Sequence, residues 1–394
     1  MATERVSRRL TDLGRVVLVV SIVASIGARL VGLDEIVVAG VVAIMTILVA
    51  FAVVTRWKPA VDVERTVHPR RLEAGSVCTV SLAITNRAAR TSLVLTLADR
   101  LDGAELGALR LAPLAAGSTR SARYEFVAEQ RGITQVGPLL AESTDPFGLV
   151  RATASHPGAT DVIVLPRIHR LDGMPVVIGE EPEVGEHRRR ILVNANDEFA
   201  TLRDYVPGDD VRWVHWPSTA RTGSPVVRHH EHPWQRRTTV LLDDRAAHHD
   251  DESFERAVSA AASVIVASHR RDELVRLVTT SGRDTGYVDD DPSFDHILDQ
   301  LAAIAPAASG SLTGAIRQLT ARGVGGQMVS CVADIADDEV AALSGAAVGV
   351  QRPIVVACGR PLDLDRASVV VVRFAEPDSL DASWSAATSR LVGR

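Results

Sequence analysis

Residues 15–54 read RVVLVVSIVASIGARLVGLDEIVVAGVVAIMTILVAFAVV and decide the first part of the fold. This stretch holds two apolar runs, 15–33 and 36–54, each about long enough to cross the ~30 Å hydrocarbon core of a bilayer as a helix. Only Asp34 and Glu35 clearly separate the runs. A cleaved signal peptide has one shorter apolar core followed by soluble sequence, so the pattern predicts a tight transmembrane hairpin. The alternative is a buried helical hairpin inside a soluble fold, but the runs carry almost no polar face.

Charged residues around the hairpin predict its orientation. The turn between the runs is acidic, and both outer flanks are basic. The positive-inside rule therefore predicts a two-pass protein of the inner (plasma) membrane, with both termini cytoplasmic and lipid as one partner. The basic residues are Arg5, Arg8, Arg9 and Arg15 before the hairpin, and Arg56 and Lys58 after it.

The composition limits the remaining possibilities. A chain of 394 residues favours several domains, and its 43 basic against 49 acidic residues give a net charge of −6. This balance does not favour nucleic acid as a partner. The three cysteines lie far apart in apolar runs, which is typical of neither a disulfide framework nor a metal site. We expect four segments: 1–58 (hairpin), 59–166 (β-sandwich-like), 167–237 (linker and motif) and 238–394 (α/β).

Residues 59–166 change to a period of two. Residues 76–86 (SVCTVSLAITN) alternate apolar and small polar residues, and 91–98, 118–128 and 133–142 behave similarly. Short strands separated by turn residues predict an antiparallel β-sandwich, which we interpret as a spacer or interaction module. The segment 144–148 (TDPFG) predicts a turn in which Asp145 caps the backbone and Phe147 plugs the core.

From Thr238 onward the pattern alternates strand and helix. Strands are expected at 238–242, 273–279, 327–332, 353–357 and 368–374, with helices at 253–269, 293–304, 312–322, 338–345 and 379–391. This alternation predicts an α/β domain with a mostly parallel sheet covered on both faces. Sites in such sheets lie at the carboxyl ends of strands, where Asp243 and Asp334 are placed.

The strand ends suggest a metal hypothesis. A von Willebrand A-like domain holds Mg²⁺ with an Asp-x-Ser-x-Ser turn, a threonine from a later loop and a later aspartate. Asp243 and Asp334 match the two aspartates, and the loop 309–314 offers Thr313, or alternatively Ser311, as the hydroxyl ligand. Arg245 and Ala247, however, replace both serines of the first turn. The expected site is therefore degenerate. In the alternative interpretation, Arg245 supplies the positive charge and pairs with Asp243 or Asp334.

Residues 197–231 contain an unusual density of arginine, aspartate and tryptophan. Three interpretations stay open: a folded linker, a docking surface, or a hydrolase in which His215 is the base. No Gly-x-Ser-x-Gly turn surrounds the nearby Ser218 and Thr219, and no Walker lysine loop is present. The candidate docking residues are Arg203, Asp204, Tyr205, Asp209, Asp210, Arg212, His215, Trp216 and Arg221.

The segment 202–223 (LRDYVPGDDVRWVHWPSTARTG), with 131–138 and 145–149 upstream, closely resembles the bacterial family called domain of unknown function 58. The resemblance implies the layout derived above: a membrane hairpin, a β domain, the motif and a von Willebrand A-like domain. It also implies association with a MoxR-type AAA+ ATPase and a transglutaminase-like membrane protein. We therefore expect a non-enzymatic, membrane-anchored adaptor protein that faces the cytoplasm. A hydrolase centred on His215 and an Mg²⁺-dependent protein-binding domain are the alternatives.

Overall fold

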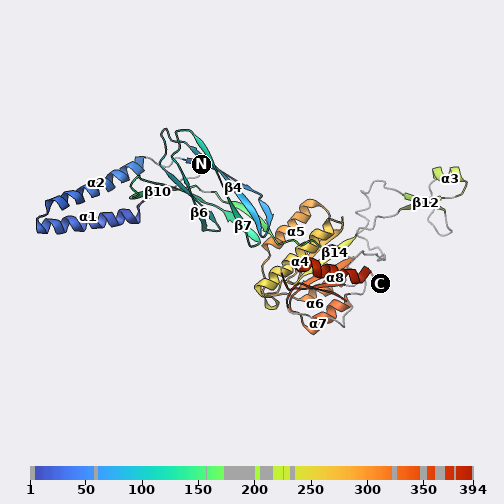
Figure 1. Cartoon of the computed structure of the whole chain (residues 1–394). Coiled ribbons are helices and arrows are strands. Elements are labelled where there is room, and N and C mark those ends of the chain that lie inside the picture. The colour runs from blue at the N-terminus through green and yellow to red at the C-terminus, as the bar shows by residue number, and fades with distance from the viewer. Residues whose placement is uncertain are drawn as a thin grey trace. The chain divides into compact units, whose positions relative to one another are not determined.

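The computed structural model describes residues 5–56, 61–156, 158–172, 200–204, 216–224, 226–230, 236–321, 326–346, 353–359, 369–376 and 379–392 (Figure 1). The chain divides into two compact units. The first comprises 1–167 with 298–304, and the second comprises 168–297 with 305–394.

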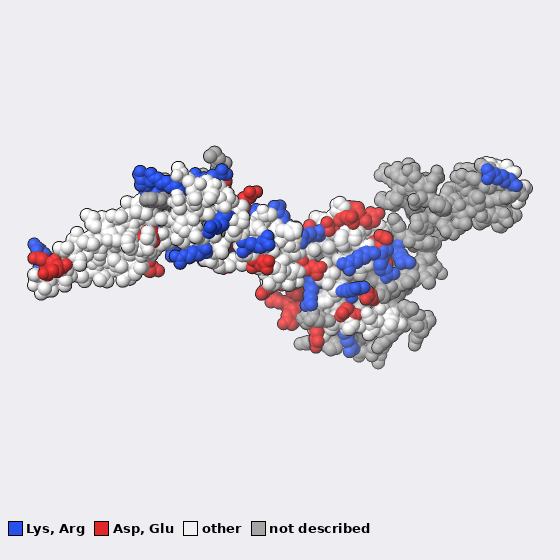
Figure 2. All heavy atoms as spheres, turned by 45° about the horizontal axis from the view of Figure 1, so that its top comes forward, with Lys and Arg blue, Asp and Glu red and all other residues white. Residues whose placement is uncertain are grey.

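The first unit begins with a helical hairpin. Helix α1 (Asp12–Val31) and helix α2 (Asp34–Arg56) each contain an 18-residue window of high mean hydropathy, 1.9 and 3.0 respectively. Both helices are long and apolar enough to cross a membrane. Thr11 caps α1, because its hydroxyl accepts a hydrogen bond from the backbone N–H of Gly14. The helices approach closely at Gly40, where an added Cβ would collide with Ser25. Figure 2 shows a largely uncharged hairpin with acidic and basic groups at its tip.

The hairpin is continuous with the β strands of the same unit. Strand β1 (Arg5–Leu10) immediately precedes α1 and pairs antiparallel with β10 (Val150–His156). Residues Ile47, Ala50 and Val54 of α2 form a small buried cluster with Val150 and Ala152 of β10. The first unit therefore joins the apolar helices directly to the edge of a sheet.

Two sheets build the β-rich part. The larger has the order β1-β10-β9-β5-β8-β11-β3, with β6 paired to β5, and the smaller has the order β2-β4-β7. Alternate side chains of both sheets fill a shared core that includes Cys78, Ile84, Leu97 and Leu139. The strands are β2 (Val61–His68), β3 (Arg71–Glu73), β4 (Ser76–Asn86), β5 (Leu95–Leu101), β6 (Ala104–Leu111), β7 (Thr119–Ala128), β8 (Gly132–Val136), β9 (Leu139–Thr144) and β11 (Thr160–Leu165).

Two sequence expectations need correction in this part. The single strand expected at 133–142 is two strands, β8 and β9, because Gly137 adopts a φ of 122° and Pro138 lacks an N–H for the ladder. Phe147 is not a core plug, since its side chain is 63% exposed. The buried position beside the turn is taken by Leu149.

The second unit contains a five-stranded parallel sheet with the order β15-β14-β16-β17-β18. This confirms the expected α/β region with a parallel sheet. The strands are β14 (Arg237–Leu242), β15 (Leu274–Thr279), β16 (Gln327–Val332), β17 (Ile354–Ala357) and β18 (Val370–Arg373). The helices are α4 (Asp251–His269), α5 (Asp291–Ala303), α6 (Leu312–Ala321), α7 (Asp337–Gly345) and α8 (Leu380–Val392). Of α5, residues 298–303 belong to the first unit.

Helices cover both faces of this sheet. Leu241 of β14 packs with residues of α6 and α7, including Ile316 and Leu343. Its neighbours Val240 and Leu242 are also fully buried and point to the opposite face because side chains alternate along a strand. Helix α4, which contacts β14 to β17, covers that face. Such two-sided burial explains the continuous apolar runs in the sequence.

The motif segment contributes a small separate element. Strand β12 (Ala200–Asp204) pairs antiparallel with β13 (Val226–His230), so the backbone of Arg203 lies opposite Val227 and that of Asp204 opposite Val226. The short helix α3 (Trp216–Thr222) lies between these strands in the sequence. The segment 167–237, expected to hold a linker and the motif, contains these elements among its described residues.

Candidate functional site

Polar side chains follow three neighbouring strands of the parallel sheet. Asp243 and Asp244 follow β14, Thr280 and Ser281 follow β15, and Asp334 follows β16. The strand order places β14 between β15 and β16, where the winding direction of the sheet reverses. Ligands of open α/β sheets bind at such a reversal, outside the carboxyl ends of the strands. This edge is therefore the expected position for a ligand-binding site in the second unit.

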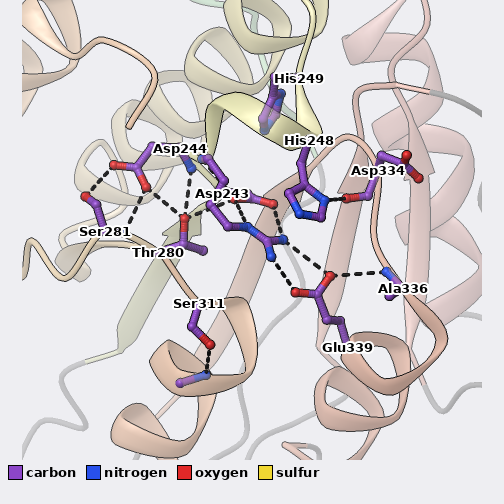
Figure 3. A network of polar contacts seen from close by, with 12 residues as sticks. Asp243, Asp244, His248, His249, Thr280, Ser281, Ser311, Asp334, Ala336 and Glu339 are labelled. Atoms are coloured by element: carbon purple, nitrogen blue, oxygen red, sulfur yellow. Dashed lines mark hydrogen bonds and ion pairs between the residues drawn. The ribbon is translucent and has the colours of Figure 1, made fainter. Parts of the chain in front are cut away.

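Arg245 forms ion pairs with both Asp243 and Glu339 at this edge, and Figure 3 shows these two carboxylates with their polar contacts. Its Nε donates to Oδ1 of Asp243 at 2.8 Å, and its Nη2 donates to Oδ2 at 2.7 Å, so the two side chains form a bidentate pair. Its Nη1 also donates to Oε1 of Glu339 in α7 at 2.6 Å. One guanidinium thus binds a carboxylate from the strand end and another from a distant helix.

Both carboxylates are held by additional contacts. The Asp243 backbone N–H donates to the Cys331 carbonyl at 3.0 Å, which fixes the turn after β14 to the neighbouring strand β16. Oε2 of Glu339 accepts from the Ala336 N–H at 3.1 Å at the start of α7. The pair is buried, since Asp243 is 0% exposed. Such geometry satisfies the demand that buried charges be paired and hydrogen-bonded.

Asp244 forms the second half of the network. Its Oδ2 accepts from the Ser281 hydroxyl at 2.6 Å, and its Oδ1 accepts from the Ser281 N–H at 2.9 Å. The Thr280 hydroxyl lies 2.8 Å from Oδ1 of Asp244 and 3.0 Å from Oδ1 of Asp243, so its single proton can serve only one of them at a time. These contacts join the turns after β14 and β15.

The electrostatics of the pair follow from these contacts. Burial raises the pKa of the Asp243 carboxyl, but the hydrogen bonds and positive charge of Arg245, with the Thr280 hydroxyl, outweigh burial and lower the pKa overall. Burial alone lowers the pKa of Arg245, whereas Asp243 and Glu339 raise that pKa above its ordinary value. The pair is therefore ionised at neutral pH.

Two histidines border the network. Nδ1 of His248 lies 2.8 Å from the Asp334 carbonyl oxygen, which ties the turn after β14 to the end of β16. The ring of His249 stacks edge-on against Phe254 at a centroid distance of 5.5 Å. Burial lowers the pKa of His249, and the nearby Asp243 charge opposes that shift only in part. His249 is consequently held in its neutral form.

The residues expected to bind Mg²⁺ are not brought together by a polar contact among the described residues. The Asp334 side chain is exposed and points away from Asp243 (Figure 3). Thr313 is half-buried near the start of α6. Both oxygens of Asp243 already accept from Arg245, so as placed they do not fit a divalent cation. No cluster of three or more His, Cys, Asp or Glu suited to a metal occurs in the described ranges.

The docking candidates are only partly described. Trp216 is 67% exposed, and Arg221 on the same short helix is exposed as well. The side chains of Arg203 and Asp204 are not described, although their backbone lies in β12. Five further candidates lie outside the described residues, so the hydrolase hypothesis for this segment stays a prediction. These five are Tyr205, Asp209, Asp210, Arg212 and His215.

Sequence reasoning found part of the strand-end network and missed the rest. The strand-end rule identified Asp243, and the missing serine positions indicated that Arg245 could pair with it. Glu339 was missed because it lies 94 residues from Arg245 and pattern alone gives no long-range contact. Its position in the first turn of a helix that follows β16 was the available signal.

The chain thus combines an apolar helical hairpin, a β-rich part and an α/β unit with a polar network at its strand ends. Residues 201–379 match the family model described as "Protein of unknown function DUF58", and this part of the chain belongs to that family. No curated protein matches the chain.

Solved structures show only faint likenesses. The CARDB domain of the PF1109 protein from Pyrococcus furiosus is 12% identical, with 27% of this chain and 89% of that chain covered and a TM-score of 0.22. The alkylpurine DNA glycosylase AlkC from Pseudomonas fluorescens is 17% identical, covering 28% and 32%, with a TM-score of 0.20. A β-glucosidase from Listeria innocua is 13% identical, covering 26% and 16%, with a TM-score of 0.18. Scores this low support no conclusion about function.

Proposed function

We propose that this protein is a membrane-anchored adaptor whose motif segment binds a partner protein at the cytoplasmic face of the inner membrane. The two N-terminal helices serve as a two-pass anchor, with both chain termini in the cytoplasm. The basic flanks of the hairpin and its acidic connecting turn support this orientation. The interaction is non-enzymatic, and the protein presents a surface to another molecule.

The main observation that supports this proposal is the exposure of Trp216. A tryptophan with 67% of its surface exposed leaves a large apolar area in water, and exposed Arg221 stands five positions along on the same helix. Tryptophan and arginine are the residue types most enriched among those that dominate protein–protein binding energy. A folded linker in which the tryptophans fill the junction would instead bury Trp216.

The partner we propose is a MoxR-type AAA+ ATPase, together with a transglutaminase-like membrane protein. This assignment comes from the family resemblance of the motif at 202–223. The α/β unit is proposed to be von Willebrand A-like, supported by its parallel sheet and by the aspartates after β14 and β16. In this arrangement the polar network stabilises the unit that carries the motif segment.

The test is capture of a purified MoxR-type ATPase from the same organism by the full chain in membranes. The double variant Trp216→Ala/Arg221→Ala should reduce capture at least about tenfold, as expected for residues that dominate an interface. Arg317→Ala, which removes an exposed arginine from α6, is the matched control and should leave capture unchanged. Equal capture by the double variant and the control would show that this surface is not the docking site.

A further inference from the structure

Phe147 is an exposed aromatic side chain on a firmly held turn between β9 and β10. The buried carboxylate of Asp145 accepts three backbone hydrogen bonds, from the N–H groups of Phe147 at 2.8 Å, Leu149 at 2.7 Å and Val150 at 2.6 Å. These bonds fix the turn, yet Phe147 is 63% exposed. The exposure is therefore a feature of the folded turn and not of a frayed loop.

The same turn is bound to the start of helix α1. The Thr11 hydroxyl donates to the Gly148 carbonyl at 2.6 Å, and the Thr11 N–H donates to the Leu149 carbonyl at 2.9 Å. Gly14 lies so close to the Leu149 carbonyl that an added Cβ would overlap it. The backbone beside Phe147 is thus fixed to the first turn of an apolar helix.

The length of α1 determines how deep this turn would lie in a lipid bilayer. Helix α1 has 20 residues and spans about 30 Å, which equals the thickness of a bilayer's hydrocarbon core. Its exposed apolar surface begins at Leu13. If α1 crosses the membrane, Thr11 lies at the boundary between acyl chains and headgroups. Phe147 then lies at the same boundary, where peripheral proteins bury exposed apolar side chains such as phenylalanine.

Basic side chains surround this boundary. Arg9 in β1 and Arg151 in β10 are directly opposite each other in the antiparallel register, so both extend from one face of the sheet. Arg151 pairs with Glu142 at 3.1 Å, whereas exposed Arg9 forms no ion pair with a described residue. Figure 2 shows basic side chains where the hairpin meets the β strands. Directly opposed like charges are unfavourable, and the Glu142 carboxylate offsets only one of these two positive charges.

We propose that this end of the β-rich part rests on an anionic membrane surface. Phe147 inserts between headgroups and acyl chains, while Arg9 and Arg151 bind lipid phosphates. We infer lipid as the binding partner of this surface because the turn is bound to α1 at the depth where headgroups lie. The inference rests on the membrane anchoring in the proposed function, but it does not involve the Trp216 surface.

Depth-dependent fluorescence quenching tests this arrangement on the full chain in nanodiscs. The native thiols Cys78, Cys331 and Cys358 are buried, so a fluorophore can be attached selectively to Phe147→Cys. A spin-labelled lipid with its label near the headgroup should quench this fluorophore at least about twice as strongly as one at Ala104→Cys. Ala104 is exposed beside the β5–β6 turn, about 20 Å along β5 from the Phe147 end.

A third labelling position tests separately whether α1 is inserted in the membrane. Val23 is exposed in the middle of α1, so Val23→Cys should be quenched by a spin label deep in the acyl chains. Quenching at Val23 with equal, weak quenching at Phe147 and Ala104 overturns the inference and leaves the anchor intact. Absence of quenching at Val23 overturns the anchor itself. A fluorophore at Phe147 that is shielded from water without lipid quenching indicates a protein partner and also overturns the inference.

The proposed role of anionic lipid is tested by changing the lipid composition. Quenching at Phe147 should increase at least about twofold when phosphatidylglycerol replaces part of the phosphatidylcholine, and high salt should reduce this gain. The double variant Arg9→Gln/Arg151→Gln should abolish the gain. Arg87→Gln, at an exposed arginine of the same unit, is the matched control and should preserve it. Identical quenching in both lipid mixtures would refute phosphate binding by these arginines.

Discussion

The guanidinium of Arg245 binds both carboxylate oxygens of Asp243, at 2.8 and 2.7 Å, and thereby places a fixed positive charge at the switch point of the parallel sheet. The two residues are only two positions apart, at the end of the strand β14. Glu339 completes the arrangement from α7. An internal cation of this kind stabilises a strand-end carboxylate without any bound ion.

Removing this cation should destabilise the second unit. Arg245→Met leaves Asp243 and Glu339 as buried carboxylates without their partner, and breaking such a buried pair costs about 3–5 kcal/mol. We expect faster amide hydrogen exchange in β14 and β16, measured on the full chain in detergent. The measurement compares the free energy of local opening in the variant with that in the native chain.

Two further variants separate charge from packing. Arg170→Ala removes an exposed ion pair with Asp172 and should change the free energy of unfolding by less than about 1 kcal/mol. Adding Asp243→Asn to Arg245→Met removes one of the uncompensated charges, so part of the lost stability should return. A double variant no more stable than Arg245→Met would contradict the buried-charge explanation.

The stability of the second unit should fall in acid because the pKa of Asp243 is lowered in the folded protein. The unfolded carboxyl has an ordinary pKa of about 3.9, so the unfolded state binds a proton first as the pH falls. The stabilisation from Asp243 is fully present above that value and is lost as pH falls through it toward the lower folded pKa. Urea midpoints between about pH 6 and pH 3 measure this loss. Asp243→Asn should show a shallower decline, and an equal slope would exclude Asp243 as its source.

Divalent cations should not bind at the strand ends of the native chain. Calorimetry with Mg²⁺ and Mn²⁺ is expected to show no saturable heat, because Arg245 already occupies both oxygens of Asp243. If saturable binding is observed, Asp334→Ala and Thr313→Ala decide whether the sequence-predicted set of Asp243, Thr313 and Asp334 holds the metal. Loss of binding in both variants would support that set.

The sequence predicted regular elements well where hydrophobic periodicity was strong. The strand expected at 76–86 is β4, and the strand expected at 327–332 is β16. Prediction failed at 133–142, where alternation continues across the Gly137-Pro138 break and hides the division into β8 and β9. Glycine followed by proline is a turn signal, so local chemistry outweighed the periodicity.

Less of the candidate site than of the strands and helices could be predicted from the sequence. Position after a strand identified Asp243, since strand ends can be predicted locally. Glu339 and Phe147 depend on tertiary contacts, because the partner of Glu339 is 94 residues away and the exposure of Phe147 depends on which neighbour fills the core. Local patterns do not contain that information.

The junction between the hairpin and the β strands depends on Gly14. An added Cβ there would overlap the Leu149 carbonyl, which belongs to the backbone and has little room to move. Gly14→Ala should therefore shift α1 away from the turn at Leu149 and weaken the cluster formed by α2 and β10. We expect a cost of about 1–3 kcal/mol, as for other overpacked positions. Hydrogen exchange of β10 amides measures this loss.

Gly27 provides the matched control on the same helix. An added Cβ at Gly27 meets no heavy atom within 4 Å, so Gly27→Ala introduces no overlap. In an exposed helical position, alanine in place of glycine should leave exchange in β10 unchanged and slightly favour the helix. Equal exchange in the Gly14 and Gly27 variants would mean that α1 is not fixed to the β10 edge at this point. Faster exchange in the Gly14→Ala variant alone would instead show that close packing at Gly14 is one of the contacts that couple the hairpin to the sheet.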